Sequence, residues 1–187
     1  MSGHGHIDPS NKKVALLIAV LALVLAFSET LGKGAQTTGL SSNIEASNLW
    51  AFFQAKTIRS TTLRTAAEAL EAELPQASRP EAREAMEKRV ADWKQTVARY
   101  DSEPETQEGR KELAARAKRA EERRDRALAA YHNYEIASAA VQIAIVLASA
   151  EIITGVVALT WIAGALGLLG IAFCGIAFFA PTAVHLF

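Results

Sequence analysis

The sequence lacks the residues and motifs on which disulfide-stabilised domains and most enzymes depend. Its 187 residues include one cysteine, Cys174, so no disulfide can form within the chain. We find no phosphate-binding glycine loop, no nucleophile motif and no zinc-protease spacing. We therefore predict a protein that is not an enzyme and that needs no cofactor or bound metal.

An excess of charge of one sign is also missing. The 20 basic residues balance 20 acidic ones, and every Lys and Arg except Lys12 and Lys13 lies between Lys33 and Arg126. A nucleic-acid surface would need a basic patch of one sign, whereas here both signs alternate. The pattern predicts solvated helical faces and no nucleic-acid partner.

Long apolar runs are present at both ends of the chain. After a polar tail (residues 1–12), residues 13–32 form a run of about the 20 residues that a transmembrane helix needs. The alternative is a cleaved signal peptide after Lys12 and Lys13, but no small-residue cleavage pattern follows. We therefore predict an uncleaved transmembrane anchor.

The second apolar block begins near Ile136 and is long enough for two crossings. We predict transmembrane helices over residues 136–157 and 161–180, with the reversal marked by Gly155 and by the Thr160–Trp161 pair. Pro181 ends the second of these, because proline cannot donate a hydrogen bond to the preceding turn. The two helices form a tight hairpin.

A charged insert, residues 33–135, separates the anchor from the hairpin. Apolar residues at alternating steps of three and four predict helices at about 43–74, 80–101 and 105–135. Lys56 and Ser60 interrupt the apolar stripe of the first of these helices. The fold class is therefore an all-α membrane protein with three transmembrane helices and a three-helix, partly coiled-coil insert.

Three antiparallel helices that start at a membrane would end away from it, so one must not run along the membrane normal. The first is the best candidate, because Trp50, Phe52 and Phe53 resemble an interfacial aromatic belt. The second and third would then form an up-and-down hairpin. The alternative, that these rings are core residues between helices, is equally compatible with the sequence.

One ionisable side chain, Glu151, lies deep in the second predicted transmembrane helix. A carboxylate there usually faces a bundle interior or a water-filled cavity, so it is a candidate proton or ion site. The alternative is a protonated or solvated group without function. Gln142 and Ser149 are candidates for the same site or for hydrogen bonds between helices.

Small residues recur along the last predicted helix at steps of four, three and four, at Ala163, Gly167, Gly170 and Cys174. Such a stripe permits close approach of helix backbones in lipid. It is either the internal seam of the hairpin or an oligomer interface, and the first is favoured.

The segments at residues 43–59, 11–20 and 144–150 resemble a bacterial membrane-protein family known only as domain of unknown function number four-three-three-seven. The resemblance covers almost the whole chain. It implies a bacterial inner-membrane protein with these segments, and it carries no activity, ligand or catalytic residue.

Basic residues at both ends of the insert outnumber the two on the other side, so the positive-inside rule places the insert in the cytoplasm. We predict a scaffold or adaptor anchored in the lipid bilayer, which forms a homo-oligomer and binds a protein partner that the sequence does not identify. The alternative function is a small oligomeric ion channel or ion-coupled transporter that uses Glu151.

Overall fold

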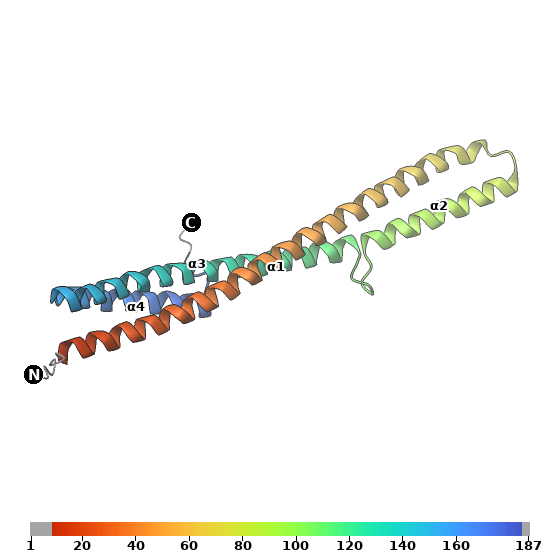
Figure 1. The fold of residues 1–187 in the computed structure, drawn as a ribbon. Helices are drawn as coiled ribbons and strands as arrows, with labels where there is room; N and C mark the ends of the chain where they lie inside the picture. Colours follow the sequence, from red (N-terminus) through yellow and green to blue (C-terminus); the bar gives the residue numbers. More distant parts are fainter. Residues whose placement is uncertain (1–8, 185–187) are drawn as a thin grey trace, which may run out of the picture. The chain divides into compact units, whose positions relative to one another are not determined.

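The chain folds into helices only, as the sequence predicts. The computed structural model describes the backbone of residues 9–184 and the side chains of residues 12–184, and it contains no strand in this range. The elements, shown in Figure 1, are α1 (Pro9–Glu73), the short 3₁₀ helix η1 (Leu74–Gln76), α2 (Pro80–Asp101), α3 (Arg110–Thr154) and α4 (Ala158–Phe179). Of the predicted tail, only residues from Pro9 are described, and they already belong to α1.

The helices build two compact units. Unit 1 consists of residues 1–40 and 123–187, and unit 2 consists of residues 41–122. Because α1 and α3 are long, each of them contributes to both units.

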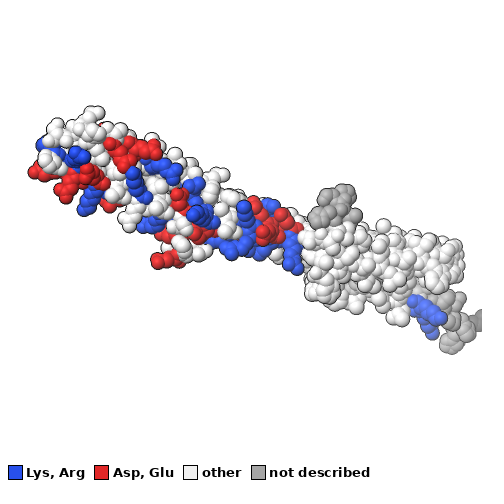
Figure 2. Space-filling view, turned by 180° about the vertical axis from the view of Figure 1, so that it is seen from behind, with Lys and Arg blue, Asp and Glu red and all other residues white. Residues whose placement is uncertain are grey.

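Three of the described helices, α1, α3 and α4, are long and apolar enough to cross a membrane. Their number agrees with the three predicted segments and indicates membrane association. Figure 2 shows that acidic and basic side chains crowd one segment of the molecule, whereas the apolar part of unit 1 has a surface almost free of them.

The reversal between α3 and α4 lies at Gly155, one of the residues that the sequence indicated, and it comes three residues earlier than the predicted helix bounds. The helix α3 ends at Thr154 and α4 begins at Ala158, rather than at 157 and 161. Gly155 has a φ of +70°, a conformation that glycine adopts without the steric cost that a Cβ would add.

The predicted separation of an anchor (13–32) from an insert helix (43–74) is wrong, because α1 runs without a break through both. Glycines in this stretch fit contacts rather than a linker. A Cβ on Gly32 would lie 3.1 Å from the Tyr134 Cβ, and one on Gly39 would lie 3.0 Å from the Leu128 Cδ2. These glycines let α1 approach α3 closely, which offsets their low helix propensity.

The predicted hairpin of the second and third insert helices is also wrong. In unit 2, α2 and the start of α3 both run antiparallel to α1, one after the other (Figure 1). Ion pairs join Glu71 to Lys94 and Arg64 to Asp101, and further back along α1 an apolar cluster joins Leu49 to Leu113.

This arrangement removes the need for an interfacial helix. The chain leaves unit 1 once, in α1, and returns through α2 and α3 in the same direction. The helix α2 spans Pro80–Asp101, the range predicted from the sequence, so the error concerned the direction of packing.

The core of unit 1 brings α1, α3 and α4 together. Its buried apolar residues are Val14, Leu21, Val141, Ala144, Ala148 and Ala163. The stripe on α4 faces this core: a Cβ added to Gly167 would contact Leu21 of α1, and one on Gly170 would contact Val141 of α3. Cys174 is half-buried. The structure thus places the small residues at an internal seam.

We predict that Gly170→Ala destabilises the protein relative to Gly175→Ala. The added Cβ at 170 would lie 2.5 Å from the Val141 Cγ2 and 3.2 Å from the Ala137 carbonyl oxygen, whereas nothing lies within 4 Å at 175. Overpacking costs about 1–3 kcal/mol, and both variants gain up to about 1 kcal/mol of helix propensity. Thermal unfolding in detergent should give a lower midpoint for Gly170→Ala. Equal midpoints would contradict the close packing.

Candidate functional site

The aromatic residues predicted for the membrane interface lie in unit 2, where α1 packs on α3. Trp50, Phe52 and Phe53 are half-buried beside the cluster of Ala46, Leu49, Leu113, Ala117 and Ala120. The Trp50 Nε1 donates a hydrogen bond to the Glu121 Oε1 at 2.9 Å, and the Arg110 guanidinium lies 5.3 Å from the Phe53 ring centre. The structure supports the alternative in which these rings belong to a helix-helix contact.

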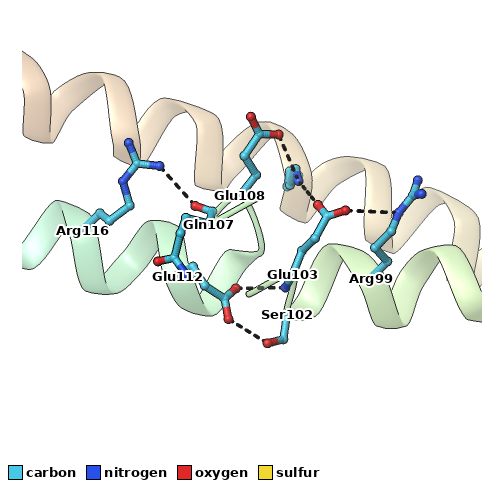
Figure 3. A network of polar contacts seen from close by, with 8 residues as sticks. Arg99, Ser102, Glu103, Gln107, Glu108, Glu112 and Arg116 are labelled. Carbon is cyan, nitrogen blue, oxygen red and sulfur yellow. Dashed lines mark hydrogen bonds and ion pairs between the residues drawn. The ribbon is translucent and has the colours of Figure 1, made fainter. Parts of the chain in front are cut away.

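Beside the rings lies a buried cation, Lys56, which sequence reasoning treated as an interruption of the apolar stripe. Its side chain is 6% exposed, and its Nζ lies 3.5 Å from the Glu103 carboxylate and 3.9 Å from that of Glu108. The rings of Phe52 and Tyr100 lie within 5.5 Å of the same Nζ. In Figure 3, dashed lines run from the carboxylates of Glu103 and Glu108 to the one residue drawn without a label, and these lines are the two ion pairs with Lys56.

These carboxylates belong to the connection between α2 and α3, which is held from its other side by Glu112. The Glu112 carboxylate accepts hydrogen bonds from the Ser102 hydroxyl at 2.7 Å and from the Glu103 backbone N–H at 3.1 Å (Figure 3). The Ser102 hydrogen bond is the main reason that the pKa of Glu112 is below its ordinary value. A Cβ on Gly109 would collide with Ser102 and Glu103, so the compact connection requires glycine there.

The contacts around Lys56 stabilise the fold. Every polar group described above ends on another group of the same unit, and its effect is to fix the α2–α3 connection onto α1. Among the side chains of residues 12–184, no group of three or more His, Cys, Asp or Glu residues could hold a metal ion.

In unit 1, Glu151 lies in the last turn of α3, close to the reversal at Gly155. The residue is 6% exposed, and its Oε2 has no hydrogen-bond partner among the described residues. The structure does not bring the other two candidates to it. Ser149 donates to the Ile145 carbonyl of its own helix at 2.8 Å, and Gln142 lies about 13 Å away along α3.

Gln142 instead pairs with a residue that sequence reasoning did not select. Its Nε2 donates to the Glu29 Oε1 of α1 at 3.2 Å. Nearby, the Ser138 hydroxyl donates to the Ser28 hydroxyl at 3.0 Å, and Ser28 donates to the Tyr134 carbonyl oxygen at 2.9 Å. A polar seam therefore joins α1 to α3 inside their apolar segments.

The seam opens into a groove of about 540 Å³ between α1 and α3. At its outer part, the Tyr131 hydroxyl donates to the Glu135 Oε1 at 2.6 Å, and the His132 Nδ1 lies 3.2 Å from the Glu135 Oε2. The hydrogen bond to Glu135 is the main reason that the pKa of Tyr131 is raised. The groove is the most polar feature of the apolar part of unit 1.

Comparison with known protein families identifies the family of this chain. The family model described as a domain of unknown function, DUF4337, matches residues 10–180. The chain belongs to the DUF4337 family. This confirms the resemblance seen in the sequence. No curated protein and no solved structure matches this DUF4337 chain.

Lys56→Ala is expected to destabilise unit 2 far more than Lys94→Ala. Lys56→Ala removes a buried side chain together with its pair to Glu103 and its contacts with two rings, at a cost of about 1–3 kcal/mol. The Lys94 side chain is 58% exposed, and its pair contributes at most about 1 kcal/mol. Urea unfolding in detergent, followed by tryptophan fluorescence in a Trp161→Phe background so that only Trp50 and Trp93 of unit 2 report, measures the difference. Similar losses in the two variants would show that Lys56 is not a special position.

Proposed function

We propose that this DUF4337 protein is a membrane-anchored helical scaffold that self-associates through unit 2. The observation that carries the proposal is an uncharged strip on α1 within the most charged part of the chain. The strip lines a shallow groove of about 630 Å³ and consists of Thr57, Ile58, Thr61, Thr62, Thr65, Ala66 and Ala69.

The strip is less polar than its composition suggests. The hydroxyls of Thr57 and Thr62 donate to the carbonyls of Phe53 and Ile58 in the preceding turn, at 2.8 and 3.0 Å. Ile58 is 67% exposed. Because these hydroxyls are already hydrogen-bonded, burying the strip against another helix leaves no donor unsatisfied at Thr57 or Thr62.

A second copy of the chain is the occupant that fits best. The strip carries no charge, so two copies can face each other without repulsion, and small side chains let helix backbones approach closely. Two copies anchored in one membrane point the same way, so a two-fold axis places equivalent residues of the strip opposite each other. The small residues of α4 already pack against α1 and α3 inside unit 1. We therefore expect the oligomer interface in unit 2 rather than among the membrane helices.

The side of the membrane on which unit 2 lies is inferred from the distribution of basic residues. Lys33 lies at one end of the charged segment and six basic residues between Arg116 and Arg126 lie at the other, which supports a cytoplasmic position for unit 2. A cytoplasmic scaffold would offer its remaining charged surface to an adaptor or to a further protein partner. This part of the proposal rests on the sequence alone.

The test is cysteine crosslinking in a Cys174→Ala background. Thr62→Cys should form a disulfide-linked dimer on oxidation in liposomes, because the strip brings the two copies together at this residue. Lys88→Cys, which is equally exposed but lies on α2, is the matched control and should stay largely monomeric. Equal crosslinking of both variants, or a strictly monomeric protein in native mass spectrometry, would remove the proposed interface.

A second candidate function, an ion-conducting oligomer, rests on Glu151. A buried carboxylate with an unpartnered oxygen, within a helix apolar enough to cross a membrane, is the kind of group that lines proton and cation pathways. Because Glu151 lies in the last turn of α3, we would expect it at the mouth of such a pathway rather than at its centre.

If Glu151 carries ions, Glu151→Gln should reduce proton or cation flux into liposomes at least tenfold, because the amide keeps the shape but not the charge. Ser149→Ala, on another face of α3, is the control and should leave flux unchanged. Absence of flux for the unmodified protein would end the channel hypothesis and leave the scaffold proposal untouched.

A further inference from the structure

We propose that the groove between α1 and α3 in unit 1 binds a phospholipid with a primary ammonium headgroup, such as phosphatidylethanolamine. The inference is independent of self-association through unit 2, which involves other residues. Its basis is a juxtaposition that the fold creates: two carboxylates and one lysine line a groove at the boundary between apolar and charged segments. These residues are Glu29, Glu135 and Lys33.

The inner part of the groove presents a carboxylate where a membrane would present hydrocarbon. Glu29 is exposed, and only its Oε1 is engaged, by Gln142. Glu29 lies about 5 Å along α1 from Gly32, where its apolar run ends, and Gln142 lies about 9 Å along α3 from Ile136, where the second apolar run begins. An ionised carboxylate at the edge of an apolar run is stabilised by a nearby cation, and a positively charged occupant of the groove would supply one.

The outer part of the groove offers groups for both charges of a zwitterion. Glu135 is oriented by the Tyr131 hydroxyl and faces the same groove as Lys33. Lys33 makes no ion pair with any described residue, so its ammonium group is available for a phosphate. Two carboxylates and one ammonium group give the lining a net negative charge, which favours a cationic amine over a purely anionic headgroup.

The size and the walls of the groove fit a lipid. Its volume of about 540 Å³ lies in the range of small-molecule pockets. Gly32 and Ala139 contribute apolar wall between the polar groups, and apolar helix surface continues beyond the inner end, where acyl chains would lie. A primary ammonium group also has three N–H donors for carboxylate oxygens, which a quaternary ammonium group lacks.

Native mass spectrometry of the full-length protein, released from detergent with defined lipids, tests the inference. The unmodified protein should retain phosphatidylethanolamine several-fold better than phosphatidylglycerol or phosphatidylcholine of the same acyl composition. Equal retention of the three lipids would overturn the proposed headgroup selectivity. Soluble phosphoethanolamine serves as a separate probe, and binding as strong as that of the lipid would show that the site takes a free phosphate ester instead.

Variants locate the site. Glu29→Gln keeps the hydrogen bond with Gln142 but removes the charge, and should lower phosphatidylethanolamine retention about two- to fivefold, the effect of one partly exposed ion pair. Lys33→Gln should weaken both phosphatidylethanolamine and phosphatidylglycerol, because both carry a phosphate. Glu105→Gln, an exposed carboxylate in the α2–α3 connection, is the control. If the control alters retention as much as Glu29→Gln, the lipid binds elsewhere.

Discussion

The antiparallel contact of α1 with α3 is the interaction on which both units depend. In unit 1 it is made by close approach at Gly32 and Gly39 and by hydrogen bonds among serines. In unit 2 it is made by small and aliphatic side chains around Leu113. One pair of helices therefore combines close backbone approach and serine hydrogen bonds in unit 1 with burial of small and aliphatic side chains in unit 2, and close approach matters most where lipid surrounds the helices.

The features of the fold that were predictable from the sequence are those encoded locally. Three apolar segments, the reversal at Gly155 and the bounds of α2 follow from hydropathy, glycine conformation and the position of Pro80. The continuity of α1 was missed because the predicted anchor was ended with its apolar run at Gly32, whereas Gly32 and Gly39 are contact positions against α3 within one helix. A contact of this kind depends on a partner more than 80 residues away in the sequence, which periodicity does not reveal.

The candidate site residues also fall into two groups, those that a local sequence signal reveals and those that depend on contacts between helices. Glu151 was selected because it is a lone charge in an apolar run, and that signal is local. Glu29 was not linked to Gln142 because their pairing depends on the register between two helices. The available signal was that Ser28 and Glu29 on one helix, and Ser138 and Gln142 on the other, are the polar positions of antiparallel apolar segments. In the sequence, Lys56 likewise only interrupts an apolar stripe. Its role becomes visible when the structure shows that the acidic α2–α3 connection packs against it.

The contrast between Lys56 and Glu29 explains why one is structural and the other points to a ligand. Lys56 is nearly inaccessible and meets two carboxylates and two rings within its own unit, so its charge is neutralised by the fold. Glu29 is accessible and has only an amide as partner, which orients the carboxylate without neutralising it. An apolar environment does not tolerate an uncompensated charge. The fold therefore completes the charge balance of unit 2, whereas the groove in unit 1 sets two carboxylates against one lysine and leaves a net negative charge for a cationic ligand.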